Sequence, residues 1–370
     1  MNRFGRLAVM AAMACAIAGP AFAQGTIKIG VEVPTTGAEA TYGRDMANAV
    51  VLAQDEINKA GGVLGKKLTM VIGDDACDPQ QAVNAASKLV SQHVLAVVGG
   101  YCSGATLPTL KIYGDAHVPF VITASNSTKL IPANPGNAFM INSTGDQQAT
   151  KAVAFLAGKG AKTLAIVNEG DAYSQDLANL TRADWTKAGH KVVAYETASS
   201  GQQDYSAIVT AIRAAKPDAV FWTAYYADGA LLIRQLRQAG YRGIIAVGDG
   251  SNSTKLFAIA GAAAEGVFCF TNPTAQFLPA AKAFIKAYKA RFGSNPGPYA
   301  PLTYDGMKLV AWAMTKAGST ASAKVIAALK TANGVQWLTG PIRFTKHNTL
   351  ARSNFIVLED RNNAWVRADK

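Results

Sequence analysis

The sequence predicts an α/β fold of two similar units, each a parallel sheet with helices on both faces. Short β-branched runs alternate with helical patterns along almost the whole chain. The alternation breaks at residues 142–148 and then restarts, and 370 residues with 49% hydrophobic composition are enough for two cores. A second break at residues 271–274 precedes two helical patterns, at 277–292 and 302–317, and short strands are expected between residues 337 and 367.

The first half begins with a strand at residues 27–31, followed by a helix whose apolar stripe runs from Met46 to Ile57. The next strand covers residues 68–72. Asp78-Pro79 then predicts the start of a helix, with aspartate as N-cap and proline at the first helical position. The run at residues 93–98 reads as a buried strand.

The second half repeats this alternation. Strands are expected at residues 164–167, 192–195, 219–222 and 244–247, and helices at 174–188, 205–215 and 229–239. Strand–helix–strand repetition of this regularity is typical of a parallel sheet covered on both faces.

The N-terminus predicts a secretory signal peptide over residues 1–23, cleaved after Ala23. Arg3 and Arg6 precede an apolar run, and Ala21-Phe22-Ala23 matches a cleavage signal. Cys15 lies inside the apolar run, so lipidation there is not favoured, although it stays open. No later run approaches the roughly 20 apolar residues of a membrane span. We therefore expect an exported, periplasmic protein.

Export makes the cysteines informative, because an oxidising compartment favours disulfides. Cys77 and Cys102 each follow a predicted strand, so both lie at the same edge of a parallel sheet. We predict a disulfide between them, which stabilises the fold by about 3 kcal/mol in the chain-entropy model. Cys269 lies in an apolar strand pattern and is expected as a buried free thiol.

The charge of the chain gives no sign of a nucleic-acid partner. The formal net charge is +12, and it falls to +10 when Arg3 and Arg6 leave with the signal peptide. Lysine and arginine are spread along the predicted helices rather than clustered, and no nucleic-acid-binding motif is present.

Two small-residue turns suggest a site for an anion. Residues 99–106 lie between a strand and a helix in which Pro108 is tolerated only within the first turn. Free N–H groups and the helix dipole favour negative charge there, and Ser103 is expected as N-cap and hydroxyl donor. A hydroxyl-rich turn at residues 123–128 follows the next strand. The alternative is that small residues merely let the chain turn.

The corresponding turns of the second half carry different chemistry. Residues 169–173, 223–228 and 248–252 are rich in tyrosine and carboxylate side chains. Ligands of such sheets bind beyond the carboxyl ends of the strands. Hydroxyl and N–H donors on one side and acidic and aromatic groups on the other suit a small zwitterion held between the units.

Catalytic and metal motifs are missing from the sequence. None of the four histidines lies in a metalloprotease or nucleophile-elbow motif, and neither a Walker A nor a dinucleotide fingerprint occurs. Asp74, Asp75 and Asp78 are more typical of strand ends and a helix cap than of a cation site. An acid–base pair such as Asp146 with Asp249 stays open. We expect neither an enzyme nor a bound cofactor or metal.

Several motifs carry a family resemblance that covers nearly the whole mature chain. They are Tyr42-Gly43-Arg44-Asp45-Met46, Asp55-Glu56-Ile57-Asn58 with Gly61-Gly62, Asp74-Asp75-Ala76-Cys77-Asp78-Pro79 with Ala82-Val83, Cys102-Ser103, Asp204-Tyr205-Ser206-Ala207 and Gly297-Pro298-Tyr299. The chain resembles the leucine/isoleucine/valine-binding proteins of branched-chain amino-acid ABC transporters. The resemblance implies a type I periplasmic binding protein, with two Rossmann-like lobes joined by a three-crossover hinge. The lobes are expected at residues 24–144 plus 272–350, and 145–271 plus 351–370.

The resemblance also implies ligand contacts. Ser103 matches a serine that binds the ligand carboxylate. Ser125 matches a residue whose carbonyl accepts from the ligand ammonium, and Ser127 a hydroxyl donor to the carboxylate. Tyr225 matches an aromatic contact from the second lobe. Asp249 stands where the best-known members have glutamate, which keeps the charge for the ammonium but shortens its reach.

The side-chain pocket is implied by three tyrosines, Tyr42, Tyr101 and Tyr173. Each is alternatively a packed aromatic at the rim. Tyr101 replaces an aliphatic residue of the family, which puts a strictly branched-chain ligand in doubt. Asp146 is interpreted as a hinge residue rather than a ligand contact.

The resemblance implies a receptor that binds a free amino acid, branched-chain or aliphatic, by hinge closure and delivers it to an ABC permease as a monomer. One alternative keeps the fold and binds an aromatic acid, another small carboxylate or a small amide. Others are a ligand sensor without a transporter and a periplasmic enzyme.

Overall fold

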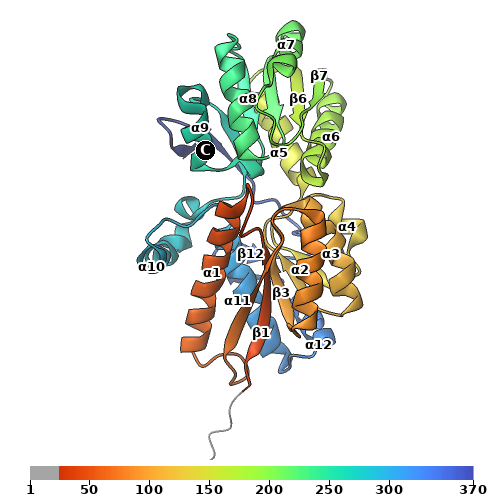
Figure 1. The fold of residues 1–370 in the computed structure, drawn as a ribbon, viewed down its shortest axis with the longest axis vertical. Coiled ribbons are helices and arrows are strands. Elements are labelled where there is room, and N and C mark those ends of the chain that lie inside the picture. The colour runs from red at the N-terminus through yellow and green to blue at the C-terminus, as the bar shows by residue number, and fades with distance from the viewer. Residues whose placement is uncertain (1–24, 370) are drawn as a thin grey trace, which may run out of the picture.

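The computed structural model describes residues 25–369, so the predicted signal peptide and Cys15 lie outside the described residues. Two α/β units lie end to end along the long axis of the molecule (Figure 1). Each has its own sheet, as the alternating sequence pattern predicts. Within residues 25–369, no helix is both long and apolar enough to cross a membrane.

The first unit is built on a five-stranded sheet in which every neighbouring pair is parallel. The strand order is β2-β1-β3-β4-β5. The strands are β1 (Ile27–Val33), β2 (Leu68–Asp74), β3 (Ala96–Gly99), β4 (Phe120–Ile122) and β5 (Ala138–Met140). The helices that follow them in the chain are α1 (Ala40–Lys59), α2 (Pro79–Ser91), α3 (Ser103–Asp115) and α4 (Leu130–Ala133).

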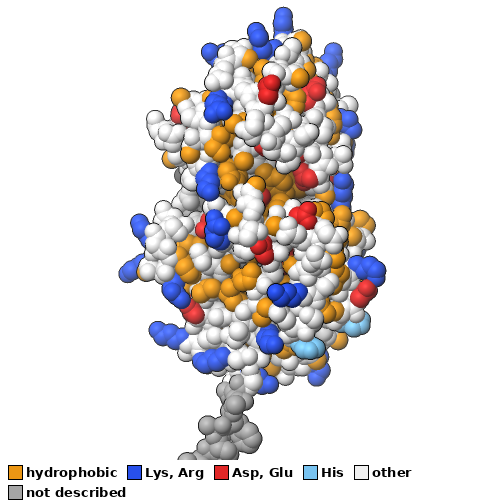
Figure 2. Space-filling model, in the orientation of Figure 1, with side chains coloured by type: hydrophobic (Ala, Val, Ile, Leu, Met, Phe, Trp, Pro, Cys, Tyr) orange, Lys and Arg blue, Asp and Glu red, His pale blue; other side chains and the backbone are white. Residues whose placement is uncertain are grey.

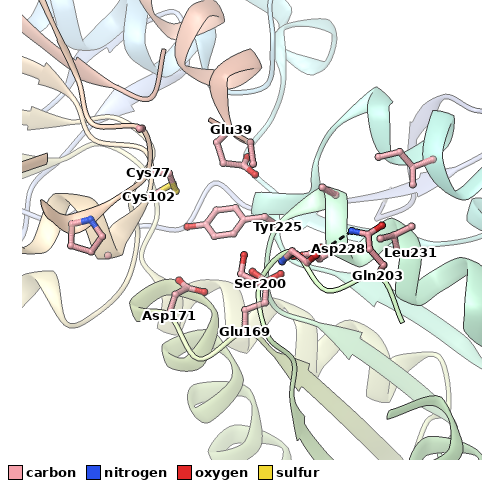
Figure 3. A pocket seen from close by; sticks show the side chains of 17 residues that line it. Glu39, Cys77, Cys102, Glu169, Asp171, Ser200, Gln203, Tyr225, Asp228 and Leu231 are labelled. Atoms are coloured by element: carbon pink, nitrogen blue, oxygen red, sulfur yellow. Dashed lines mark hydrogen bonds between the residues drawn. A yellow bond between two sulfur atoms is a disulfide. The ribbon is translucent and has the colours of Figure 1, made fainter. Parts of the chain in front are cut away.

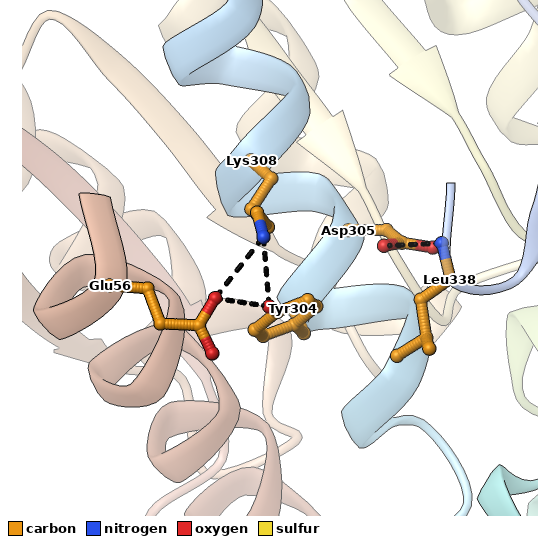
Figure 4. A network of polar contacts seen from close by, with 5 residues as sticks. All are labelled: Glu56, Tyr304, Asp305, Lys308 and Leu338. Atoms are coloured by element: carbon orange, nitrogen blue, oxygen red, sulfur yellow. Dashed lines mark hydrogen bonds and ion pairs between the residues drawn. The ribbon is translucent and has the colours of Figure 1, made fainter. Parts of the chain in front are cut away.

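A later segment of the chain completes this first unit. It contains α10 (Lys282–Phe292), α11 (Ala300–Ala317), α12 (Ser322–Leu329) and the hairpin of β11 (Val335–Trp337) and β12 (Gly340–Ile342). Helix α11 packs along α1, and α12 packs against α11. Figure 4 shows the polar link: Glu56 of α1 accepts hydrogen bonds from Tyr304 and from Lys308 (Nζ–Oε2 3.2 Å) of α11. Asp305 anchors the hairpin by accepting from the Leu338 amide at 3.1 Å.

The second unit has a seven-stranded sheet of order β14-β13-β10-β9-β8-β6-β7. Its strands are β6 (Thr163–Asn168), β7 (Lys191–Thr197), β8 (Ala219–Trp222), β9 (Ile244–Val247), β10 (Phe268–Thr271), β13 (Ile356–Asp360) and β14 (Trp365–Arg367). Its helices are α5 (Gly145–Gly158), α6 (Ala172–Lys187), α7 (Ser206–Ala215), α8 (Tyr226–Gln238) and α9 (Thr254–Ala260). Strands β6 to β10 pair in parallel, whereas the C-terminal strands β13 and β14 add an antiparallel edge.

The connections between the units follow from this topology. The chain leaves the first sheet after β5, returns after β10 to form α10 to β12, and enters the second sheet again at β13. It therefore passes between the units three times.

Two local details of the helices differ from the sequence prediction. Cys102 rather than Ser103 caps α3, and Pro108 lies inside that helix beyond its first turn. The helix predicted at residues 277–292 begins at Lys282, because Pro279 follows a short 3₁₀ turn and opens another. The predicted start of α2 is confirmed: the Asp78 carboxylate accepts from the Gln81 amide at 2.8 Å, with Pro79 as the first helical residue.

The predicted disulfide is confirmed. Cys77 and Cys102 are bonded, with their Cα atoms 5.4 Å apart. The bond joins the loop after β2 to the turn between β3 and α3, so at the carboxyl edge of the sheet it links the two strands that flank β1. Cys269 is a free, fully buried thiol in β10, as predicted.

Candidate functional site

The candidate site is a small cavity at the facing edges of the two sheets. Its empty space is about 190 Å³, part of it open to solvent, and about 10 Å³ of this admits the centre of a water molecule. Residues from both units line it: Tyr101, Ser103, Ala124, Asn126, Tyr173, Tyr225, Asp249, Gly250 and Tyr299. Five of the predicted site residues, Tyr101, Ser103, Tyr173, Tyr225 and Asp249, are therefore brought to one cavity.

The first-unit wall is formed by the turns after β3 and β4. Gly99 and Gly100 have φ of +135° and +73°, and a Cβ on Gly99 would stand 2.1 Å from the Glu32 carbonyl oxygen, so glycine is required there. This turn brings Ser103 to the first position of α3. The Ser103 Oγ accepts from the Ser127 amide at 3.2 Å and makes no helix-capping bond. It therefore retains its own proton for a ligand oxygen.

In the turn after β4, some side chains line the cavity and others form hydrogen bonds with neighbouring protein groups. Ala124 and Asn126 line the cavity, whereas the Ser125 hydroxyl is bonded to Thr106 Oγ1 at 2.7 Å. The Ser127 hydroxyl donates across to the second unit, to Asp176 Oδ2 at 2.9 Å. A direct contact from the Ser127 hydroxyl to a ligand carboxylate would require these bonds to break. The Ser125 contact expected from the family uses its backbone carbonyl, which the side-chain bond leaves free.

The second-unit wall presents one buried carboxylate. Asp249 opens a 3₁₀ turn after β9 and is 2% exposed. Its oxygens accept from Tyr173 Oη at 2.8 Å, Gln148 Nε2 at 3.0 Å and Asn126 Nδ2 at 3.2 Å. Burial raises the pKa of Asp249, and the hydrogen bonds from Tyr173 and Gln148 oppose the rise. Neutral donors hold this carboxylate, and within residues 25–369 no lysine or arginine forms an ion pair with it, so it is suited to a ligand cation.

Tyrosine rings form much of the remaining wall. Tyr101 stacks on Tyr42 with centroids 4.9 Å apart and meets the edge of Tyr299 at 5.3 Å. Tyr173 and Tyr225 approach from the second unit, with centroids 5.5 Å apart. Burial raises the pKa of all five phenols well above its usual value, so they stay neutral. Tyr42 lies behind Tyr101 and supports it, and its hydroxyl donates to the Gly250 carbonyl at 3.4 Å.

A wider cleft lies outside this cavity and shares Tyr225 with it. It encloses about 1460 Å³, part of it open to solvent. Figure 3 shows Glu39 from the first unit facing Tyr225 and Glu169, Asp171 and Asp228 from the second. Hydrophobic side chains gather at this junction in Figure 2, while Lys and Arg lie mainly around the outline. The larger of the two spaces is not the one that suits a ligand best. The Ser103 hydroxyl and the Asp249 carboxylate, which could bind the two ends of a zwitterion, both line the smaller inner cavity.

The carboxyl groups of this outer cleft are strongly perturbed. Burial raises the pKa of Glu39 to about 8, against a hydrogen bond from the Tyr101 hydroxyl that lowers it. Burial and the neighbouring Asp228 raise the pKa of Glu169 to about 10. Both side chains are therefore largely protonated at neutral pH.

The acidic residues near the disulfide serve the fold. Asp74 Oδ1 accepts from the Thr35 and Ala76 amides at 2.8 and 3.0 Å, and Asp75 accepts from the Cys77 amide at 2.8 Å. Asp78 caps α2. No group of three or more potential metal ligands occurs among the residues that the structure describes.

Sequence reasoning missed four lining residues, Ala124, Asn126, Gly250 and Tyr299. Asn126 belongs to the hydroxyl-rich turn, but the residues of that turn that match family ligand contacts are its neighbours Ser125 and Ser127. Tyr299 lies almost two hundred positions from Tyr101 in the chain, and only its occurrence in the Gly297-Pro298-Tyr299 motif marked it. Asp146, interpreted from the sequence as a hinge residue, is exposed in the first turn of α5 and lies outside the cavity lining.

Comparison with known proteins gives consistent matches over almost the whole chain. The model of the family described as periplasmic binding protein matches residues 26–362. A "Leucine-, isoleucine-, valine-, threonine-, and alanine-binding protein" of Pseudomonas aeruginosa is 33% identical over 360 residues, covering 97% of this chain and 96% of the relative. An "Amino acid binding protein" of the same organism is 32% identical, with 90% of each chain covered.

Solved structures agree. The leucine-binding protein LivK of Thermotoga maritima has a TM-score of 0.86 at 28% identity, covering 92% of this chain and 97% of that one. The branched-chain amino acid transporter substrate-binding protein LivJ of Streptococcus pneumoniae, in complex with isoleucine, has a TM-score of 0.85 at 27% identity, covering 92% and 98%. The chain belongs to the periplasmic binding protein family, whose members bind ligands in the periplasm rather than act as enzymes.

Proposed function

We propose that this protein binds a free α-amino acid with an aliphatic side chain in the inner cavity and delivers it to the membrane permease of an ABC importer. The names of its relatives support an amino acid as ligand, because they describe amino-acid-binding and branched-chain amino-acid-binding proteins. We propose that it acts as an exported monomer whose signal peptide, residues 1–23, is removed.

The two poles of an amino acid match the two walls of the cavity. The ligand carboxylate accepts from the Ser103 hydroxyl and from free N–H groups at the start of α3, where the helix dipole also favours negative charge. The ammonium pairs with Asp249 and donates to the Ser125 carbonyl, with the Tyr225 ring beside it. The Ser127 backbone amide donates a hydrogen bond to Ser103 Oγ and so orients the Ser103 hydroxyl.

One observation carries the proposal: Ser103 and Asp249, from different units, line the same small cavity. A donor for an anion and a buried carboxylate without an ion-pair partner among the described residues thereby line one space, as a zwitterion needs. A ligand that lacks either charge would leave one wall desolvated and unpaired, which is costly.

Binding is proposed to couple to closure of the two lobes, residues 24–144 plus 272–350 and 145–271 plus 351–370. Polar contacts already cross between the lobes, including Lys255 Nζ to Thr41 Oγ1 at 2.6 Å and Thr128 Oγ1 to Asp176 Oδ1 at 2.9 Å. A ligand that touches both walls favours this closed arrangement over an open one, and the closed form is then available to the permease.

Isothermal titration calorimetry with alanine, valine, leucine and isoleucine tests the proposal. Each amino acid that binds is compared with the amine that lacks its carboxylate and with the acid that lacks its ammonium. We expect at least one amino acid to bind and both truncated analogues to bind at least a hundredfold more weakly, because each leaves a charged or donor group unpaired. Equal affinity for the carboxylic acid would overturn the role of Asp249 and favour a plain carboxylate ligand.

A further inference from the structure

Five cationic side chains gather on the second unit, at the end away from the candidate site. They line two neighbouring hollows, one with Arg234, Arg237 and Arg242 and the other with Arg213, Lys216 and Arg242. Because Arg242 borders both hollows, the five side chains form one continuous surface, which we call the basic surface. No acidic residue lines either hollow. Cations that are dispersed along the sequence are therefore brought together by the fold.

The basic surface lies at the amino ends of the strands, opposite the inner cavity. Lys216 precedes β8 and Arg242 precedes β9, whereas Tyr225 and Asp249 follow these same strands. Figure 1 shows α7 and α8 reaching the end of the second unit that points away from the first, and Lys and Arg side chains lie over this end in Figure 2. The basic surface belongs to one unit only, so it does not depend on how the two units are arranged.

The cations of the basic surface form no ion pair within residues 25–369, because the six ion pairs there all involve other side chains. Backbone carbonyls hold two of the guanidinium groups instead. Arg237 Nη1 donates to the carbonyls of Tyr241 and Gly243, both at 3.0 Å. Arg242 Nη1 donates to the Arg237 carbonyl at 3.1 Å. These bonds use one nitrogen of each guanidinium group and leave the Nε and Nη2 donors for an external anion.

The acidic residue next to this surface in the chain is Asp218, two positions after Lys216. Its Oδ2 accepts from the amides of Lys162 and Thr163 at 2.9 and 2.8 Å and from Thr163 Oγ1 at 2.8 Å. These bonds fix the start of β6, and Asp218 lines neither hollow. It therefore does not neutralise the basic surface.

Helix ends explain only part of this arrangement. Arg213 and Arg237 lie in the last turns of α7 and α8, where the helix dipole favours cations. Lys216 ends α7 with φ of +46° and ψ of +54°, a left-handed conformation that favours glycine. Burial lowers the pKa of Arg237, and the neighbouring charge of Arg242 lowers it further. The fold therefore holds like charges together at a site where an anion from outside would relieve their repulsion.

We propose that the basic surface docks on the anionic phospholipid headgroups of a membrane. Four of its five cations are arginines, whose planar guanidinium groups bind phosphate through two parallel hydrogen bonds. A transporter that responds to closure has to contact both units, whereas a membrane can be contacted by the far end of one unit. Docking would keep the protein close to the membrane whichever ligand the inner cavity binds, so this inference does not rest on the proposed function.

Co-sedimentation with lipid vesicles tests the docking. The protein without its predicted signal peptide, residues 24–370, is mixed with vesicles of phosphatidylcholine that contain about one-third phosphatidylglycerol, and with vesicles of phosphatidylcholine alone. We expect binding to the anionic vesicles at about 0.05 M salt, at least tenfold weaker binding at about 0.5 M salt because the charges are screened, and none to the neutral vesicles. Equal binding to both kinds of vesicle would overturn the proposal. So would binding to neither, and an acidic protein surface would then be the partner to test.

A triple variant locates the binding on the protein. Arg213→Gln, Lys216→Gly and Arg242→Gln together remove three exposed charges, and glycine suits the backbone at position 216. Each cation near an anionic bilayer strengthens binding about fivefold, so we expect the triple variant to bind the anionic vesicles roughly a hundredfold more weakly. Thermal unfolding checks that the variant is folded.

The matched control removes the same charge from the first unit. It combines Lys88→Gln, Lys286→Gln and Lys346→Gln, three exposed lysines that lie in α2, in α10 and after β12. We expect this control to bind the anionic vesicles within about threefold of the wild type, since weak long-range attraction is all that it loses. Equal losses in the two triple variants would overturn the proposal, because the net charge of the protein rather than the basic surface would then determine binding.

Discussion

The inner cavity and the outer cleft lie side by side between the same two lobes, yet their carboxyl groups differ in the number of hydrogen bonds that they accept. Asp249 of the inner cavity is held by donors from Tyr173, Gln148 and Asn126. The Glu39 carboxyl of the outer cleft accepts one hydrogen bond from a described side chain, Tyr101, and burial raises its pKa to about 8. Burial raises the pKa of Asp249 as well, but the hydrogen bonds from Tyr173 and Gln148 oppose that rise and favour the charged form that a ligand ammonium would pair with. A carboxyl that is protonated at neutral pH mainly shapes the space around it.

The largest expected difference between the two regions is in ligand affinity. Asp249→Asn removes the charge that pairs with the ligand ammonium, and we expect a loss of about 3–5 kcal/mol, more than a hundredfold in affinity by calorimetry. Glu169→Gln is the matched change in the outer cleft and is expected to alter affinity by less than about threefold, because Glu169 is already largely protonated. Equal losses in both variants would show that the two regions form one binding site.

The disulfide stands at the border of the two regions, since Cys102 lines the outer cleft and the next residue, Ser103, lines the inner cavity. Replacing Cys77 and Cys102 together by serine is expected to lower the free energy of unfolding by about 3 kcal/mol, because the bond closes a loop of sequence separation 25. Denaturant unfolding measures this. We expect a reductant to lower the free energy of unfolding of the wild type and to leave that of the double variant unchanged. An equal reductant effect on both proteins would show that the disulfide is not the source of the stabilisation.

The raised pKa of Glu39 also predicts how stability depends on pH. Its pKa is about 8 in the folded protein against an ordinary value of 4.5, so between these values the folded state binds more protons than the unfolded state. The free energy of unfolding therefore falls as pH rises from about 5 to about 8, by up to about 1.4 kcal/mol per pH unit for this group. Asp228 and Lys255 face Glu39 and act in opposite directions on its pKa.

Glu39→Gln should make that slope shallower, measured by denaturant unfolding at pH 5, 6.5 and 8. Glu32 and Asp75, whose pKa values burial raises to about 8 and about 7, remain in the variant, so part of the slope persists. Glu32→Gln, in the core of the first unit and remote from the ligand, is the control for the generic effect of removing one buried carboxyl. An identical slope in Glu39→Gln and wild type would contradict the protonated state assigned to Glu39.

Much of the fold was predictable because it depends on local pattern. Strand and helix periodicity predicted the two units, and the common direction of parallel strands placed Cys77 and Cys102 at one sheet edge. The same rule brought Ser103 and Asp249 to facing edges. These predictions need only the element type and the direction of the strands, which sequence periodicity carries.

The rest depends on torsion angles and packing that periodicity does not contain. Whether Asn126 or its neighbour Ser127 faces the cavity is decided by the backbone of one short turn. The bond between Tyr101 and Glu39 joins residues 62 positions apart and depends on both rotamers. The antiparallel edge of the second sheet could not be predicted either, because the sequence of a short strand does not show whether it pairs parallel or antiparallel.

The smallest expected effect on ligand affinity is at Asp176 of α6, which lines neither the inner cavity nor the outer cleft. Its carboxylate accepts from the Thr128 amide at 2.6 Å and from the Ser127 hydroxyl at 2.9 Å, so it joins the second lobe to the first without lining the inner cavity. Asp176→Asn weakens a contact that the closed form makes, and water replaces it in an open form. We expect a loss of about 1 kcal/mol, roughly fivefold in affinity, through a shift toward the open form.

Small-angle scattering and calorimetry on Asp176→Asn test this shift together. The ligand-free variant is expected to be more extended than the wild type, and saturating ligand should remove the difference. Asp184→Asn is the control: Asp184 lies on the same helix and accepts from Thr150 Oγ1 at 3.1 Å, within the second lobe. If Asp176→Asn binds as tightly as this control and has the same radius of gyration, the contact between the lobes does not contribute to closure. Affinity would then be set at the inner cavity alone.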